Sequence, residues 1–293
     1  MTADKITRRS ALAAIAGTAG AWLAASSGAD PGSVSPLTVP VKAGLLKHSV
    51  CRWCYGKMEL DELCRNAAAM GIHSVELLGE PEWPIVKKYG LTCAMPNGPS
   101  GIVDGWNRPQ DHDRLVKRSE ELLPKIKEAG FSNAIVFSGN LRGLTPQESL
   151  ANCAAGIKRI TKLAEELGIT LHLELLNSKR DHKDYAGDNT KWGFELVKRV
   201  ESDRFKILYD IYHMQIMEGD VIATIQENIS MIGHFHTGGV PGRHEIDETQ
   251  ELNYRRIAQA IADTGYRGFV AQEFIPKLDP MASLRQGIEI FSV

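Results

Sequence analysis

The sequence lacks several features that would assign a protein to a class at once. The first missing feature is an excess of one charge. Its 293 residues include 34 lysines and arginines and 36 aspartates and glutamates, for a formal net charge of -2, without an acidic or basic tail. Proteins that bind nucleic acid or a membrane surface usually carry a basic stripe. We therefore expect neither partner.

Cysteine is scarce and irregularly spaced. The five cysteines are an odd number and widely scattered, which excludes the disulfide framework of a small secreted domain. Cys51 and Cys54 have the C-x-x-C spacing of a redox pair or of half a zinc site, but no second such pair follows. We interpret them as buried or pocket-lining thiols, with redox or zinc use as the minor alternative.

Long apolar runs are also lacking, except near the N-terminus. Arg8 and Arg9 precede an uncharged apolar stretch from Ala11 to Ala25, which is too short to span a bilayer comfortably, and a Ser/Gly/Pro-rich segment follows. Basic, apolar and small-residue regions in this order are typical of a secretory signal, and paired arginines indicate the twin-arginine type.

This pattern sets the expected domain boundaries. We predict a twin-arginine-type signal peptide at 1–29, a flexible linker at 30–43 and one domain at 44–293. The protein would then be exported to the periplasm, with no membrane contact after signal cleavage. A cytoplasmic protein with an uncleaved N-terminus is the alternative.

The sequence does contain a recurring unit, in which a helix ends at a glycine and a short apolar run follows. Four glycines stand at such positions: Gly71, Gly130, Gly168 and Gly265. Glycine readily adopts the left-handed conformation that ends a helix, and a short apolar run after it indicates a buried parallel strand. The corresponding runs are 74–78, 133–137, 169–175 and 268–274.

The fold prediction follows from counting such elements. Further strand candidates are 45–50, 91–95, 205–210 and 231–237, and helical stretches such as 114–129 and 147–167 separate them. In the second of these, Ile157, Ile160 and Ala164 belong to an i, i+3, i+4 apolar stripe. Eight strands that alternate with helices predict a single-domain α/β fold, the (β/α)₈ TIM barrel. An open doubly wound sheet is disfavoured, because no strand leads into the G-x-G-x-x-G turn of that fold.

Ionisable residues stand at the carboxyl ends of four successive strand candidates: Glu174, Asp210, His236 and Glu273. Functional side chains of such a barrel come from these strand ends. Singly, each could be a helix cap, an ion-pair partner or a hydrogen-bonded core residue. Together, three carboxylates in one desolvated pocket would repel one another unless a cation neutralised them. Oxygen-rich ligation with one imidazole suits Mn²⁺, Mg²⁺ or Co²⁺, so the sequence predicts a divalent metal site.

The most distinctive motifs lie in the second half of the chain. They are Tyr209-Asp-Ile-Tyr-His-Met-Gln215, Met217-Glu-Gly219, Pro241-Gly-Arg-His-Glu245, Glu251-Leu-Asn-Tyr254 and the run 268–274. These motifs resemble the hydroxypyruvate isomerase family, within the xylose-isomerase-like barrels. The resemblance extends from about Leu45 to the C-terminus and is specific in the second half.

The resemblance implies roles for individual residues. Glu174 and Glu273 would be the catalytic, proton-shuttling pair as well as metal ligands, and Asp210 would complete the metal site. His213 and Arg243 would contact the substrate. From the residues alone, a helix-capping or core histidine and a solvated loop arginine remain alternatives for these two positions.

The implied reaction is the metal-dependent isomerisation of hydroxypyruvate to tartronate semialdehyde (2-hydroxy-3-oxopropanoate) through an enediolate. One departure from the family bears on the substrate, because His236 stands where hydroxypyruvate isomerases often carry glutamine and related ketose epimerases carry histidine. A ketose 3-epimerase or another keto-sugar isomerase is therefore the first alternative. A metal-dependent endonuclease of the same barrel would need more histidines and a basic face. A barrel that binds a sugar acid without catalysis is the non-enzyme alternative.

Two further properties stay open at this level. The sequence is compatible with a homo-oligomer but does not indicate one. Trp53, Trp83 and Trp106 could line a sugar pocket, although a core position is the commoner outcome for tryptophan.

Overall fold

The computed structural model describes residues 40–41 and 44–293. The predicted signal peptide at 1–29, with its paired arginines, and most of the predicted linker at 30–43 lie outside these residues. Both, and the export that they imply, therefore stay predictions. Among the helices that are described, none is long and apolar enough to cross a membrane.

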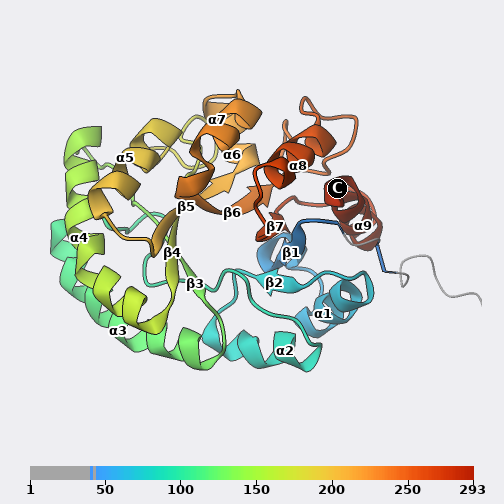
Figure 1. The fold of residues 1–293 in the computed structure, drawn as a ribbon, viewed down its shortest axis with the longest axis horizontal. Helices are drawn as coiled ribbons and strands as arrows, with labels where there is room; N and C mark the ends of the chain where they lie inside the picture. The colour runs from blue at the N-terminus through green and yellow to red at the C-terminus, as the bar shows by residue number, and fades with distance from the viewer. Residues whose placement is uncertain (1–39, 42–43) are drawn as a thin grey trace, which may run out of the picture. The chain divides into compact units, whose positions relative to one another are not determined.

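Parallel strands form a single sheet in the described part of the chain, in the order β2-β1-β7-β6-β5-β4-β3. They are β1 Lys47–Cys51, β2 Ser74–Glu76, β3 Asn133–Val136, β4 Thr170–Glu174, β5 Phe205–Asp210, β6 Ile232–Thr237 and β7 Phe269–Gln272. Figure 1 shows these strands as an inner ring with the helices outside. β5 and β6 are almost wholly buried, as expected of parallel strands that helices cover.

The predicted strand 91–95 differs from the expectation, because it is not a regular strand. It forms a single bridge, between Ser74 and Thr92. Its other neighbour is β3, where the N–H of Ile135 donates to the carbonyl of Pro96 at 3.2 Å. A three-residue β2 on one side and a proline without an N–H at the end of the segment leave few ladder partners. The segment still joins the two ends of the sheet and takes the eighth position of the barrel. The ring is therefore closed.

The close approach at this closure depends on Gly98. A Cβ atom at this position would lie 1.7 Å from the carbonyl oxygen of Ile135. Any side chain would therefore push the segment away from β3. Glycine is required where the barrel closes.

Helices follow the strands along the chain and form the outer layer. Those described are α1 Leu60–Ala69, α2 Trp83–Lys88, α3 His112–Glu128, α4 Pro146–Leu167, α5 Thr190–Val200, α6 Ile211–Met217, α7 Val221–Asn228, α8 Tyr254–Asp263 and α9 Pro280–Phe291. The predicted helices 114–129 and 147–167 are confirmed as α3 and α4, each within two residues at its ends.

Both ends of α4 show how local sequence sets a helix. The Thr145 side chain accepts from the N–H of Glu148, and the Glu148 carboxylate accepts from the N–H of Thr145 in return. Gly168 ends the helix in the left-handed conformation, with φ of 68°. The other three predicted helix-ending glycines also have positive φ, so the recurring unit is confirmed.

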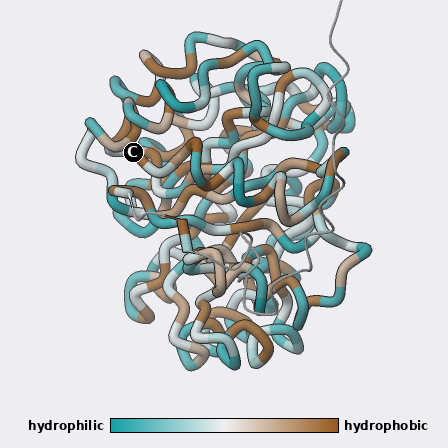
Figure 2. Tube along the Cα trace, turned by 90° about the vertical axis from the view of Figure 1, so that its right-hand side faces the viewer, coloured by the Kyte–Doolittle hydropathy of each residue, from teal (hydrophilic) through white to brown (hydrophobic). Residues whose placement is uncertain are grey.

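The apolar faces of the helices pack into one continuous core. In α4, Ile157, Ile160 and Ala164 are buried in it, as the predicted stripe requires. Burying each isoleucine contributes about 2 kcal/mol relative to an exposed position. Figure 2 shows this division of each helix into a buried and an exposed face: hydrophobic and hydrophilic segments alternate within single helices.

Candidate metal and active site

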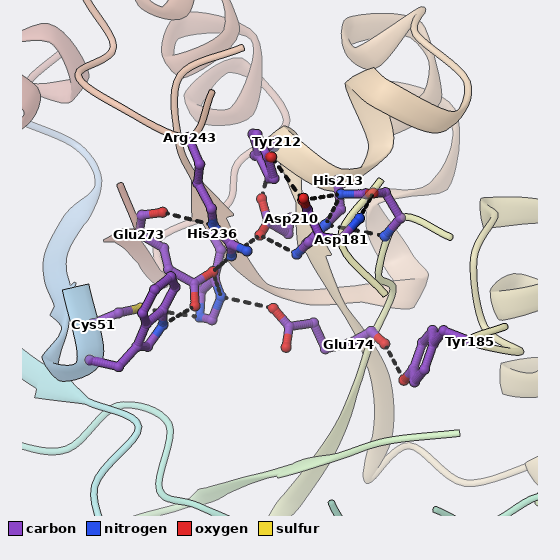
Figure 3. Close-up of polar contacts among 12 residues, drawn as sticks. Cys51, Glu174, Asp181, Tyr185, Asp210, Tyr212, His213, His236, Arg243 and Glu273 are labelled. Carbon is purple, nitrogen blue, oxygen red and sulfur yellow. Dashed lines mark hydrogen bonds and ion pairs between the residues drawn. The ribbon is translucent and has the colours of Figure 1, made fainter. Parts of the chain in front are cut away.

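Four ionisable side chains meet at the carboxyl end of the barrel. Glu174 and Asp210 are the last residues of β4 and β5, His236 is the penultimate residue of β6, and Glu273 directly follows β7. Their exposures are 4%, 0%, 0% and 3%. Because these four strands are consecutive neighbours in the sheet, their ends bring the side chains together, as Figure 3 shows. One donor atom from each lies within 4.8 Å of those of the other three.

His236 lies at the centre of this cluster. Its Nδ1 is 3.2 Å from Glu174 Oε1 and 2.9 Å from Glu273 Oε2. On the other side of the ring, Nε2 is 2.8 Å from Glu76 Oε1. Burial opposes protonation of His236, but its contacts with the carboxylates of Glu273 and Glu174 outweigh burial and raise its pKa well above the ordinary value. The ring therefore connects two carboxylates at the mouth to one deeper in the barrel.

Arg243 brings a fixed positive charge to the same place. Its Nη2 lies 3.1 Å from Asp210 Oδ2 and 2.6 Å from Glu273 Oε2. The guanidinium also lies over the rings of Trp53 and Tyr212, 5.0 and 4.8 Å from their centroids. Its side chain is only 12% exposed. The alternative of a solvated loop arginine is therefore wrong.

The three carboxyl groups of the cluster have different proton affinities. Burial, reinforced by Glu273, raises the pKa of Glu174 above its ordinary value. Burial also raises the pKa of Asp210 well above its usual range, against the opposing charge of Arg243. For Glu273, burial is outweighed by Arg243 and His236, which hold its pKa well below the ordinary value. Groups that bind and release protons differently are what acid–base chemistry uses.

The donor set fits a hard divalent cation. Three buried carboxylates and one imidazole supply the oxygen-rich ligands that Mn²⁺, Mg²⁺ or Co²⁺ prefer. A cation among them would also remove the repulsion that Arg243 and His236 leave between the carboxylates. The structure thus contains buried acidic and imidazole groups that could hold a metal ion.

His213 lies on α6, three residues after Asp210, and is fully buried. Its Nδ1 accepts the backbone N–H of Asn177 at 3.1 Å and faces the Asn177 amide nitrogen at 2.7 Å. The ring proton is therefore on Nε2, which lies 3.5 Å from Asp210 Oδ2 and makes no hydrogen bond among the described residues. Burial and the charge of Arg243 hold the pKa of His213 well below its ordinary value. A neutral ring thus offers a buried N–H to a ligand.

A cavity of about 650 Å³ opens onto the cluster. Its lining includes four of the predicted site residues: Glu174, His213, Arg243 and Glu273. Trp53 also lines it, and its Nε1 donates to Glu273 Oε1 at 2.6 Å. Of the three tryptophans considered as pocket walls, Trp53 lies at the cavity, whereas Trp83 and Trp106 are buried in the core.

Sequence reasoning missed Glu76 and His234, which extend the polar network into the barrel interior. Glu76 Oε1 lies 2.8 Å from His236 Nε2 and 2.9 Å from His234 Nε2. Burial disfavours the charged carboxylate, but the two histidines outweigh burial and lower the pKa of Glu76 to about 2. A glutamate inside an apolar run and two histidines on the same face of one strand are the signals that could have identified them.

The cysteines are free and buried, in agreement with the interpretation of Cys51 and Cys54 as buried thiols. Burial raises the pKa of Cys51 well above its usual range, so its thiol stays protonated near neutral pH. Its Sγ lies 3.9 Å from His236 Nε2. Cys51 therefore packs against the cluster as a neutral group.

Known proteins share this fold and sequence pattern. A family model described as a xylose isomerase-like TIM barrel matches residues 64–292. A 2-oxo-tetronate isomerase of Cupriavidus necator is 33% identical over 237 residues, which cover 74% of this chain and 88% of that protein. A protein of Homo sapiens, provisionally named a hydroxypyruvate isomerase, is 33% identical over 176 residues, which cover 60% of this chain and 53% of that protein.

Solved structures show the same architecture. One titled AP endonuclease, family 2, from Brucella melitensis has a TM-score of 0.73 at 25% sequence identity, and the match covers 82% of this chain and 96% of that one. Ketose 3-epimerases are among the further similar proteins.

Proposed function

The chain belongs to the xylose isomerase-like TIM barrel family, and on that premise we propose that it is a divalent-metal-dependent isomerase of a short hydroxy-keto acid. The observation that carries the proposal is the convergence of four buried side chains at the barrel mouth: Glu174, Asp210, His236 and Glu273. The proposed cofactor is Mn²⁺, Mg²⁺ or Co²⁺, held by these four residues. The first proposed substrate is hydroxypyruvate, and the product is then tartronate semialdehyde.

In this proposal Glu174 and Glu273 are the catalytic pair. Both carboxylates approach the same ring nitrogen of His236, so a substrate bound at the cluster would lie beside both of them. Glu174 has the raised pKa of a group that accepts a proton readily. Trp53 and Arg243 hold Glu273 in place through Oε1 and Oε2.

The proposed reaction transfers protons between neighbouring atoms of the substrate. One carboxylate removes a proton from C3 of hydroxypyruvate and an enediolate forms. A proton then returns to C2, while the C3 hydroxyl gives up its proton and the C2 oxygen gains one. When bound, the cation supplies Lewis-acid stabilisation of the negative charge that develops on the substrate oxygens. Protein groups do the rest by holding both carboxylates beside the reacting carbons in a mostly buried site.

A substrate with its own carboxylate suits the donors beside the cluster. Arg243 uses Nε and Nη2 in its contacts with Asp210 and Glu273, and its Nη1 makes no hydrogen bond among the described residues. The Nε2–H of His213 likewise makes no hydrogen bond there. A carboxylate or hydroxyl oxygen of the substrate would satisfy both donors. We therefore keep both residues as substrate-binding candidates.

A second substrate is favoured by one comparison. The similar 2-oxo-tetronate isomerase is matched over 88% of its length, so we propose 2-oxo-tetronate, a four-carbon acid, as the alternative to hydroxypyruvate. The endonuclease title of the Brucella structure does not extend to this chain. The candidate metal cluster of this chain contains one histidine, and the net charge of the chain is -2, whereas nucleic-acid binding relies on a basic surface.

The test is a metal-supplemented substrate screen. Protein stripped of metal with a chelator is given Mn²⁺, Mg²⁺ or Co²⁺ and then hydroxypyruvate, 2-oxo-tetronate or a ketose, and the products are identified by NMR. We expect isomerisation of the keto acids only with metal, and none by a Glu174→Gln, Glu273→Gln double variant. Epimers of the ketose without keto-acid products would establish the epimerase alternative. Binding without any turnover would establish a non-catalytic sugar-acid-binding barrel.

A further inference from the structure

Glu76 connects two strands that are not neighbours. β1 and β7 lie between β2 and β6 in the sheet, yet the carboxylate of Glu76 reaches across the interior to His234 and His236. The three side chains are fully enclosed, with exposures of 0%, 1% and 0%. A buried carboxylate at this depth requires hydrogen-bond donors, and the two ring nitrogens are the donors it has.

The direction of these hydrogen bonds fixes which nitrogen of His236 faces the mouth. An ionised carboxylate only accepts, so both histidines donate from Nε2 to Oε1 of Glu76. Nδ1 of His236 is then the atom directed at Glu174 and Glu273. A half-turn of the ring would place C–H groups against the buried carboxylate and leave Glu76 without this donor.

We propose that Glu76 is a positioning residue of the metal site: by accepting the Nε2–H of His236, it holds Nδ1 toward the cation and strengthens that nitrogen as a ligand. Carboxylates that bond to the far nitrogen of a metal-binding histidine typically change metal affinity by about 10–100-fold. The inference rests on the proposed metal-dependent function. It adds a residue of β2 to a site whose other members come from β4 to β7 and the loop after β6.

A purely structural role for Glu76 predicts a different result. His234 makes the same hydrogen bond without facing the cluster, so Glu76 could serve only to satisfy His234. Its loss would then lower stability and leave metal affinity unchanged. His172 provides a matched control, because it is 2% exposed in the same interior, packs against the His234 ring at 6.1 Å between centroids, and makes its Nε2 contact with Asn133 instead.

The experiment compares full-length wild type, Glu76→Gln and His172→Gln after metal removal. Glutamine keeps the shape and one acceptor oxygen but removes the charge. Mn²⁺ affinity is measured from the EPR signal of free Mn²⁺, and stability from thermal unfolding in EDTA. We expect Glu76→Gln to bind Mn²⁺ about 10–100-fold more weakly and His172→Gln to remain within about twofold of wild type. In the Mg²⁺-loaded wild type labelled with ¹⁵N-histidine, the proton of His236 should be on Nε2.

Four results would decide against parts of this picture. Unchanged Mn²⁺ affinity in folded Glu76→Gln would overturn the positioning role, and so would a wild-type spectrum with the His236 proton on Nδ1. If Glu76→Gln does not fold, Glu76→Asp, which keeps the charge but shortens the side chain, should show the affinity loss, and unchanged affinity there overturns the role as well. Wild type that binds none of the three cations would overturn the proposed metal-dependent function itself.

Discussion

Arg243 and Glu273 form a buried ion pair at the mouth of the barrel, with 2.6 Å between Nη2 and Oε2. The same Nη2 lies 3.1 Å from Asp210 Oδ2, so one guanidinium counters two of the four candidate ligands. An arginine side chain does not lose its proton in a protein, so this charge is permanent. Arg243 thus reduces the repulsion within the cluster that we propose as the cation site.

Removing this charge should make the protein depend on metal for stability. In EDTA, Arg243→Gln should unfold at a clearly lower temperature than wild type, because losing one partner of a buried pair costs about 3 kcal/mol or more. Saturating Mn²⁺ should raise the unfolding temperature of the variant by more than that of wild type. Arg199→Gln, which breaks an exposed pair with Glu195, is the control and should change stability by less than about 1 kcal/mol. Equal metal stabilisation of Arg243→Gln and wild type would contradict this reading.

The two-glutamate mechanism predicts a defined isotope pattern. Hydroxypyruvate turned over in D₂O should carry deuterium at C2 of tartronate semialdehyde, because a proton held on a carboxylate exchanges with solvent before its return. Glu174→Gln and Glu273→Gln keep an oxygen for the cation but lose the base. Each should lower kcat by about 10²–10⁴-fold, measured at saturating metal. A Glu273→Gln variant with near wild-type turnover would place the proton transfer on another group.

Asp210→Asn separates the loss of a base from the loss of a ligand. Asp210 neither accepts nor donates a proton in the proposed mechanism. Asp210→Asn should therefore lose activity because it binds the cation more weakly. Excess Mn²⁺ should then restore part of its activity, whereas it should restore none in Glu174→Gln. Identical responses of the two variants to Mn²⁺ would mean that their roles are not distinct.

The carboxyl ends of the strands were predictable because they follow from local rules. The periodic apolar runs locate the strands, and helix-ending glycines such as Gly168 fix where each run begins. Once a barrel is assumed, residues such as Glu174 and Asp210 must share one end of it. Each step uses only residues that are close in the sequence.

Contacts between distant segments were not predictable in this way. Trp53 and Glu273 are separated by 220 positions, and nothing near either residue indicates that an indole donates to that carboxylate. Glu76 likewise meets His236 only because the ring closes and brings β2 opposite β6. The irregular segment at 91–95 reads as a strand from its composition, and only its neighbours on both sides show why it cannot form a full ladder.

Acid should destabilise the protein through those buried histidines whose pKa is lowered, and His48 gives a clear case. Burial, reinforced by His73, lowers the pKa of His48 to about 4. An unfolded histidine has a pKa of about 6.5, so between these values the unfolded chain binds one more proton than the folded one. Stability therefore rises with pH across this window and is lost as pH falls from about 6.5 to about 4, by up to ~3 kcal/mol from this residue.

Urea denaturation at pH 7.5 and pH 5 measures that contribution. Glutamine at position 48 can keep a hydrogen bond to Ser292, which His48 contacts at 2.9 Å, but cannot titrate. His48→Gln should therefore lose less stability than wild type between the two pH values. An equal loss would show that other groups account for the acid sensitivity.

Export remains a prediction from residues outside the described structure. Arg8→Lys with Arg9→Lys keeps the positive charge of the segment but removes the paired arginines. The double variant should accumulate in the cytoplasm, whereas wild type should appear in the periplasmic fraction. Unchanged periplasmic recovery of the double variant would refute the twin-arginine route.

The exposed position of Trp53 has a practical consequence. Its side chain is 44% exposed at the cavity and bonds to Glu273, whereas Trp83, Trp106 and Trp192 are 4%, 0% and 6% exposed. Indole emission moves to shorter wavelength when water leaves the ring, so a ligand in the cavity will alter the emission of Trp53 and leave that of the three buried indoles unchanged. The protein thus contains its own optical probe, and site occupancy can be titrated by fluorescence without a label and without turnover.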